Sequence, residues 1–214
     1  MSKCEYCITM QVFHVKDTII HVKNIEVEGF CTGLAYSHGR WVVGILGPPP
    51  MVNILSDEGD ILHTLTTNTS DDDLFEKPDY IHVDTITDNH RVLVSDRDKK
   101  TVYMLDSELQ LLQAFKLPPT GESWGLAAVG GGQVLVADAG SHTLQLLDIN
   151  TGRWRTLLGK EELQLLPNSL VYNRTTSCLF VGGNGNEVRV YTLSRWSHSS
   201  DSFSLNASDD FKYQ

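Results

Sequence analysis

The sequence has only four cysteines among 214 residues, and it has no long uninterrupted run of apolar residues. A membrane-spanning helix needs about 18 or more consecutive apolar residues, so none is expected. The N-terminal stretch MSKCEYCITMQVFHV has no basic segment followed by a long apolar run, which argues against a secretory signal peptide. We therefore expect a cytoplasmic chain with reduced thiols and no membrane partner.

Recognisable metal and catalytic motifs are also missing. Cys4 and Cys7 form a single C-x-x-C pair, whereas a structural zinc site needs four ligands and usually two such pairs. The sequence contains no G-x-S-x-G, H-E-x-x-H or phosphate-binding-loop motif. We therefore expect no metal, no cofactor and no catalytic residue.

Positive charge is scarce: the chain has 17 Lys and Arg residues and 27 Asp and Glu residues, which gives a net charge of −10. Nucleic-acid backbones attract cationic surfaces, so this total argues against general nucleic-acid binding. The chain has one small basic cluster, made of Arg91, Arg97, Lys99 and Lys100. We interpret this cluster as part of a solvated loop.

The sequence does contain an internal repeat. VLVSDRDKKTVYMLD (92–106) and VLVADAGSHTLQLLD (134–148) share an apolar run, an Asp, a turn and a second apolar run. Their aspartates recur 42 positions apart as two pairs, Asp96 with Asp138 and Asp106 with Asp148. Two further copies, the second of them degenerate, occupy 178–193 and 40–59. A repeat of about 40 residues indicates a solenoid or a propeller.

Each copy is accompanied by further short apolar segments. Opening segments precede the copies at 33–37, 80–84, 125–129 and 169–173, and closing segments follow three of them at 60–67, 109–117 and 152–159. Val, Ile, Leu, Tyr and Thr dominate these runs, and turn-forming residues separate them, which is typical of short strands. Four antiparallel strands per repeat predict an all-β β-propeller with four-stranded antiparallel blades. A β-sandwich would not explain the period.

The repeat unit resembles the NHL repeat, in which G-[IL]-A-[VL] precedes an apolar run with V-A-D, a turn, and a second apolar run ending in Asp. PDYIHVD…VLVSDRDKKTVYMLD and SWGLAAV…VLVADAGSHTLQLLD carry this resemblance. The segment 10–44 looks like the beginning of the C-terminal NHL domain of invertebrate tripartite-motif-like proteins, where a lone strand leads into the first blade. The resemblance implies a protein-interaction scaffold that recruits substrates for a ubiquitin-ligase assembly, although this chain contains no RING.

The resemblance also bears on domain organisation. About four blades are recognisable, whereas NHL propellers usually have six. Either the chain forms an incomplete part of a six-bladed ring, or residues 8–27 and the tail supply further structure. We expect N-terminal strands over 1–27, NHL-like repeats over 28–196 and a polar, disordered tail over 197–214. An incomplete ring would expose sheet faces and edges, which favours self-association.

The binding face of a propeller is expected on the loops at the mouth of its channel. The candidate residues lie before or at the start of the opening strands, and they are Lys77, Asp79, Tyr80, Glu122, Trp124 and Asn168. Trp124 is flanked by polar residues and would make a good anchor for a protein partner, with packing between blades as its other interpretation.

The four repeated aspartates are expected to be structural. Asp96, Asp138, Asp106 and Asp148 follow apolar runs, where a carboxylate commonly accepts hydrogen bonds from the backbone of a turn. The preferred hypothesis is thus a non-enzymatic propeller that binds a protein. Two alternatives stay open: binding of single-stranded RNA by the propeller face, and a calcium-dependent, lactonase-like hydrolase with Asp79, Glu122 and Asn168 as ligands.

Overall fold

Antiparallel strands make up nearly all of the regular structure. The computed structural model describes residues 7–67, 72–85, 90–119, 121–184 and 187–195, and the backbone of 203–207. The helix found in this part of the chain is α1 (Lys160–Leu163). It is far too short to cross a membrane, and no other described segment forms a helix that could.

The strands form one hairpin and four sheets. The hairpin consists of β1 (Cys7–Val15) and β2 (Ile19–Glu28). The first sheet contains β3 (Phe30–Ser37), β4 (Arg40–Leu46), β5 (Met51–Ser56) and β6 (Ile61–Leu65). The second sheet contains β7 (Pro78–Asp84), β8 (Arg91–Asp96), β9 (Thr101–Leu105) and β10 (Leu111–Lys116).

The third and fourth sheets repeat this pattern. The third contains β11 (Ser123–Gly130), β12 (Gln133–Asp138), β13 (Thr143–Asp148) and β14 (Arg153–Leu158). The fourth contains β15 (Pro167–Asn173), β16 (Cys178–Gly183), β17 (Val188–Arg195) and β18 (Phe203–Ala207). In every sheet the strands are antiparallel and lie in the order of the chain.

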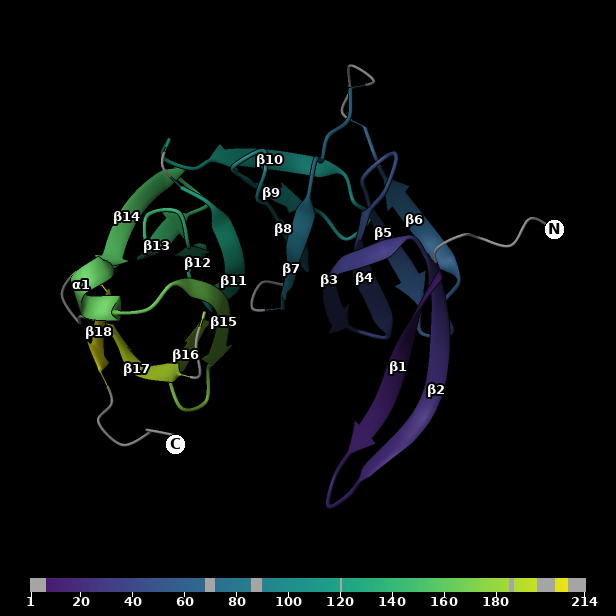
Figure 1. Cartoon of the computed structure of the whole chain (residues 1–214), viewed down its shortest axis with the longest axis horizontal. Helices are drawn as coiled ribbons and strands as arrows, with labels where there is room; N and C mark the ends of the chain where they lie inside the picture. The colour runs from purple at the N-terminus through teal and green to yellow at the C-terminus, as the bar shows by residue number, and fades with distance from the viewer. Residues whose placement is uncertain are drawn as a thin grey trace.

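Figure 1 shows the four sheets side by side in an arc. Their opening strands are neighbours, since β3 contacts β7, β7 contacts β11, and β11 contacts β15. Four-stranded sheets arranged radially, with the first strand of each innermost, define the blades of a β-propeller. The structure therefore confirms the predicted fold class.

The hydrophobic core lies between the sheets, and this explains the repeated apolar runs. Strand β12 is buried at every position from Gln133 to Asp138. Val134 and Val136 pack toward the second sheet, whereas Leu135 and Ala137 pack toward the fourth. A strand covered on both faces needs apolar side chains at successive positions, so VLVA is continuous rather than alternating.

Glycine at the start of an opening strand lets neighbouring sheets approach closely. A Cβ on Gly125 would lie 2.7 Å from the backbone nitrogen of Leu170 and 2.8 Å from Cα of Ser169. A Cβ on Gly33 would lie 3.0 Å from the carbonyl oxygen of Asp79. The glycine of the repeat pattern is thus required by the close approach of inner strands.

The repeated aspartates Asp96 and Asp138 bind backbone amides at equivalent places. The Asp96 carboxylate accepts hydrogen bonds from the N–H groups of Glu76 (2.7 Å), Lys77 (3.2 Å) and Lys99 (3.0 Å). Asp138 accepts hydrogen bonds from the N–H groups of Glu122 (2.8 Å) and Ser141 (3.2 Å). Each carboxylate therefore ties a hairpin turn to the segment that precedes the opening strand of the same sheet.

Asp106 and Asp148 occupy the next turn of their sheets and bind only local amides. Asp106 accepts hydrogen bonds from the N–H groups of Glu108 (2.9 Å) and Gln110 (2.8 Å). Asp148 accepts hydrogen bonds from those of Asn150 (2.9 Å) and Thr151 (3.1 Å). Both aspartates cap the turn that follows them in the chain.

The segment before the first sheet is a two-stranded hairpin, in the region where N-terminal strands are expected. One feature departs from the sequence-based expectations. Strand β18 lies within the tail for which disorder is expected, and its backbone pairs with β17, Leu205 opposite Leu193. The alternation of apolar and polar residues in FSLNA explains this strand, because it has the period of a sheet. The other residues of 197–214 lie outside the described part.

Candidate binding site

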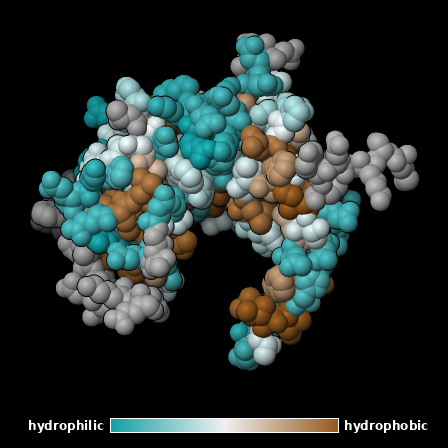
Figure 2. Space-filling model, in the orientation of Figure 1, coloured by the Kyte–Doolittle hydropathy of each residue, from teal (hydrophilic) through white to brown (hydrophobic). Residues whose placement is uncertain are grey.

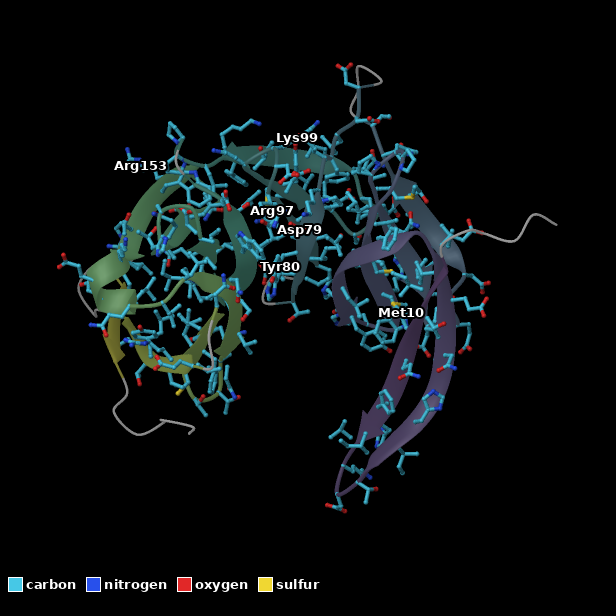
Figure 3. All side chains as sticks on the ribbon, in the orientation of Figure 1. Met10, Asp79, Tyr80, Arg97, Lys99 and Arg153 are labelled. Atoms are coloured by element: carbon cyan, nitrogen blue, oxygen red, sulfur yellow. The ribbon has the colours of Figure 1, made fainter. Side chains whose placement is uncertain are left out.

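The candidate site lies where the second and third sheets meet, at the start of their opening strands. Asp79 and Tyr80 are the second and third residues of β7, and Trp124 is the second residue of β11. Arg97 follows β8 directly, in the turn that Asp96 caps. Figure 3 shows Asp79, Tyr80 and Arg97 grouped together in the middle of the arc.

Arg97 is the centre of this group of four residues, which we call the Arg97 cluster. Its guanidinium carbon lies 4.9 Å from the centre of the Trp124 ring. Its Nε lies 3.4 Å from Oδ2 of Asp79 and 3.2 Å from Oδ1 of the neighbouring Asp98. The rings of Tyr80 and Trp124 have their centroids 6.0 Å apart, at 52°. A cation over an indole ring contributes about 0.5–2 kcal/mol, depending on its exposure.

Asp79 is the buried carboxylate of the cluster. It is 9% exposed, and burial together with the carboxylates of Asp98 and Asp96 raises its pKa from 3.8 to about 6. The Arg97 guanidinium lies within ion-pair distance but does not form a hydrogen bond with Oδ2. Burial also raises the pKa of Tyr80, and the Asp79 charge adds to this effect. The site therefore combines half-buried aromatic rings with a carboxyl group that titrates near neutral pH.

Two buried polar atoms of the cluster have no hydrogen-bond partner in the described part of the chain, namely Oδ2 of Asp79 and Nε1 of Trp124. Most buried polar atoms in folded proteins are satisfied, so each such exception needs an explanation. An acceptor and a donor at the same junction match the needs of a ligand that offers both, as an amide group does.

The cluster is not part of the repeat. Tyr80 occupies the position that Gly33, Gly125 and Ser169 hold in the other opening strands. A large aromatic ring therefore stands at one junction where the others have a small residue. Side chains that recur in every sheet stabilise the sheet arrangement itself. A residue that differs from this pattern at one junction is therefore a candidate for a specific binding site.

The remaining predicted residues are placed differently. Lys77 and Glu122 lie two residues before Asp79 and Trp124, and their backbone amides donate hydrogen bonds to Asp96 and Asp138. The amide of Asn168 donates to Oδ1 of Asn184 (3.1 Å), which directly follows β16. The structure thus brings Asp79, Tyr80 and Trp124 together, whereas the hydrogen bond of Asn168 is made to a residue of its own sheet.

Arg97 is the residue that sequence reasoning missed. The sequence places it in a solvated loop, but its side chain is only 23% exposed and packs against the next sheet. Arg97 follows Asp96, and the equivalent residue after Asp138 in the third sheet is Ala139. This difference between the two copies of the repeat is the sequence feature that could have identified Arg97. Trp124 also packs against the core between the third and fourth sheets, so it both supports the fold and borders the site.

The described residues do not assemble a metal-binding group of the usual kind. No three His, Cys, Asp or Glu side chains among them lie close enough to hold one ion. Asp79 lies beside Arg97, and the Asn168 amide bonds to Asn184, so a calcium site formed by Asp79, Glu122 and Asn168 stays a prediction.

Comparison with known proteins supports the fold. No family model matches the sequence, and no curated protein does. The structure is similar to the β-propeller domain of Cps50 (Swd1) from Myceliophteria thermophila, with a TM-score of 0.63 and 12% identity over 89% of this chain and 62% of that one. It is similar to virginiamycin B lyase from Staphylococcus aureus, with a TM-score of 0.62 and 12% identity over 94% and 59%.

U3-55K is a third similar structure, with a TM-score of 0.60 and 16% identity over 76% of this chain and 48% of that one. The chain thus spans between about half and three fifths of these three proteins. At such identities the likeness establishes the fold alone. The protein is a β-propeller protein.

Proposed function

We propose that this protein is a non-enzymatic propeller scaffold that binds a protein partner at the Arg97 cluster. The observation that carries the proposal is the stacking of Arg97 on Trp124 beside Tyr80 at a single junction of the ring. Tyr, Trp and Arg are the residues that most often dominate the energy of protein interfaces. Half-buried rings lose little side-chain entropy on binding, which favours such an anchor.

The polar atoms of the cluster support a peptide as the bound element. Trp124 Nε1 is a donor and Asp79 Oδ2 an acceptor, and both lack hydrogen-bond partners in the described part of the chain. Both atoms are buried, so a peptide carbonyl and N–H would satisfy them only after the side chains of the cluster move apart. The NHL-like repeat pattern suggests a finer form of the proposal, in which the partner is a protein recruited to a ubiquitin-ligase assembly.

Single-stranded RNA has less support. Arg97 is engaged with Asp79 and Asp98, and the side-chain ammonium groups of Lys99 and Lys100 donate to the carbonyl oxygens of Asp73 and Pro119. The cationic groups of this turn are thus occupied by the protein itself. Binding of a phosphate backbone would have to displace these contacts on a chain of net charge −10.

Affinity capture with matched variants tests the proposal. The purified chain, Arg97→Ala and the control Arg153→Ala, which removes an exposed arginine of β14, are incubated with cell lysate with and without RNase. We expect a set of proteins that the wild type and Arg153→Ala retain in both arms and that Arg97→Ala loses. Retention by all three variants would contradict the proposal, and loss with RNase would support RNA instead.

A further inference from the structure

Two histidines from neighbouring sheets lie in contact, outside the Arg97 cluster. His38 is in the turn between β3 and β4, and His90 immediately precedes β8. The centroids of their rings are 4.1 Å apart, and the ring planes are tilted by 52°. Because His90 precedes β8 and Arg97 follows it, this contact joins the first and second sheets at the opposite end of the strand from the Arg97 cluster. We call the two residues the His38–His90 pair.

The pair is not part of the repeat. The turns between the first and second strands of the third and fourth sheets consist of residues 131–132 (Gly-Gly) and 174–177 (Arg-Thr-Thr-Ser), without a histidine. As at Tyr80, side chains that stand at one junction and not at the others are candidates for a specific role.

Ser37 holds one ring nitrogen of His38. Its Oγ lies 2.6 Å from Nδ1 of His38. In metal sites, a ligating histidine commonly donates its other ring N–H to such an oxygen. With Nδ1–H as the donor, Nε2 of His38 keeps the lone pair that a metal ion requires. His38 is exposed, so its ring has room to turn about its side-chain bonds.

His90 has a ring nitrogen without a hydrogen-bond partner. Its Nδ1 is buried and forms no hydrogen bond within the described residues. Most buried polar atoms in folded proteins are satisfied, and an imidazole lone pair is satisfied by a donor or by a metal ion. Because Nδ1 is buried, an ion would reach it only after a neighbouring side chain moves, and the exposed ring of His38 is in contact with His90.

The spacing of the two rings suits a single ion. Nitrogen ligands lie about 2.0–2.1 Å from Zn²⁺, so two imidazole nitrogens on one ion are about 3 Å apart. Rings whose centres are already 4.1 Å apart need only modest rotations to place two nitrogens in this way. Imidazole is a good ligand for Zn²⁺, Cu²⁺ and Ni²⁺.

We propose that His38 and His90 together bind a divalent transition-metal ion, which links the first and second sheets and keeps water in its remaining positions. With two protein ligands, this site is smaller than the three-residue groups that the described residues lack. It is also separate from the Arg97 cluster, so the two sites can be tested independently.

Calorimetric titration of the full chain with Ni²⁺ tests the proposal, at about pH 7.5 because ligating imidazoles must be unprotonated. All proteins carry Cys4→Ser and Cys7→Ser, so that the C-x-x-C pair cannot take up the ion. We expect one ion per chain. His38→Gln or His90→Gln should each raise the dissociation constant about 100-fold, because the second ligand acts at a high effective concentration. Ser37→Ala should raise it about tenfold.

His21→Gln is the matched control. His21 is an exposed histidine two residues after the start of β2, and the centre of its ring lies 5.4 Å from that of Phe13 rather than beside a second imidazole. Figure 2 shows the end of the β1–β2 hairpin as an apolar group that stands clear of the sheets. His21→Gln should therefore bind Ni²⁺ with unchanged affinity.

Thermal unfolding gives a second readout, because an ion that bridges two sheets binds only the folded chain. At a Ni²⁺ concentration about 100-fold above the dissociation constant, the unfolding midpoint should rise by about 5 °C or more. The rise should be absent in His38→Gln and His90→Gln, whose folding circular dichroism establishes. In the chain with both histidines, paramagnetic Ni²⁺ should broaden the NMR signals of these two rings first, which tests the site without substituting a ligand.

Four results would each overturn the proposal. They are an affinity no better than that of free imidazole, an unchanged affinity in His38→Gln or His90→Gln, an equal loss of affinity in His21→Gln, and broadening that begins at other histidines.

Discussion

The guanidinium carbon of Arg97 lies 4.9 Å from the centre of the Trp124 ring. A turn of the second sheet is thus in contact with the opening strand of the third. This contact exists only while the two sheets are packed together. The candidate site is thus a product of the propeller arrangement, and its integrity depends on the turns and glycines that hold neighbouring sheets in place.

The two types of repeated aspartate should differ in their effect on stability. Asp138 is 1% exposed, and Asp138→Ala leaves the amide of Glu122 and the Ser141 hydroxyl without their partner. We expect a loss of about 2–3 kcal/mol in the free energy of unfolding. Asp148→Ala, which removes only local turn bonds, should cost less than about 1 kcal/mol. Urea denaturation measures both, and equal losses would contradict this account.

Gly125 should tolerate no side chain, because its Cβ would meet the backbone of the fourth sheet at 2.7 Å. Gly125→Ala is expected to push the third and fourth sheets apart and to lower the free energy of unfolding by about 1–3 kcal/mol. Gly47→Ala is the matched control, since the nearest atom to its Cβ would be 3.9 Å away. If thermal unfolding shows the same stability for both variants, the close approach of inner strands does not limit the fold.

Much of the fold could be predicted from the sequence. The 42-residue spacing of Asp96 and Asp138 sets the period, and the apolar runs locate the strands because strand burial follows directly from local residue type. The hairpin before the first sheet was harder to predict, since its base is stabilised by long-range contacts of Met10 with the first sheet. Strand β18 was not predicted because the sequence around it is rich in polar residues, and the alternation of apolar and polar residues in FSLNA is short.

The candidate site could be predicted only in part. Asp79, Tyr80 and Trp124 were candidates because their position before or at an opening strand is a property of the repeat. Arg97 was missed because its burial comes from the third sheet, which is distant in sequence. The pairing of Asn168 with Asn184 could not be predicted either, because it depends on the register of β15 with β16.

Stability should depend on pH through Asp79. Its pKa is raised from 3.8 to about 6, so the folded protein holds this proton more tightly than the unfolded chain does. Its contribution to stability is therefore present below about pH 4 and is lost, by about 2 kcal/mol, as the pH rises to about 6. Asp79→Asn should remove this decline. Urea unfolding of both proteins between pH 4 and 7 measures it, and parallel pH profiles would contradict the raised pKa.

His82, three residues further along β7, should have the opposite effect. Its Nε2 accepts a hydrogen bond from the N–H of Ala128 (3.2 Å), which requires an unprotonated Nε2, and burial lowers its pKa from 6.5. The folded state thus binds this proton less tightly, so stability is present above about pH 6.5 and is lost as the pH falls through the folded pKa.

His82→Gln keeps an acceptor without a titrating ring, and it should reduce this loss of stability at acidic pH. The measurement is the difference in urea midpoint between His82→Gln and the wild type across pH 5–8. A difference that stays constant over this range would show that His82 is not held in its neutral form.

Site-directed photo-cross-linking is the most direct test of the central claim that the Arg97 cluster binds a protein. A photoreactive residue replaces Glu122, which is exposed and lies two residues before Trp124, or Arg153, which is exposed on β14. The account predicts a discrete cross-linked protein from position 122 in RNase-treated lysate, its loss when Trp124→Ala is added, and no such product from position 153. The same product from both positions, or one from position 122 that Trp124→Ala leaves unchanged, would contradict it.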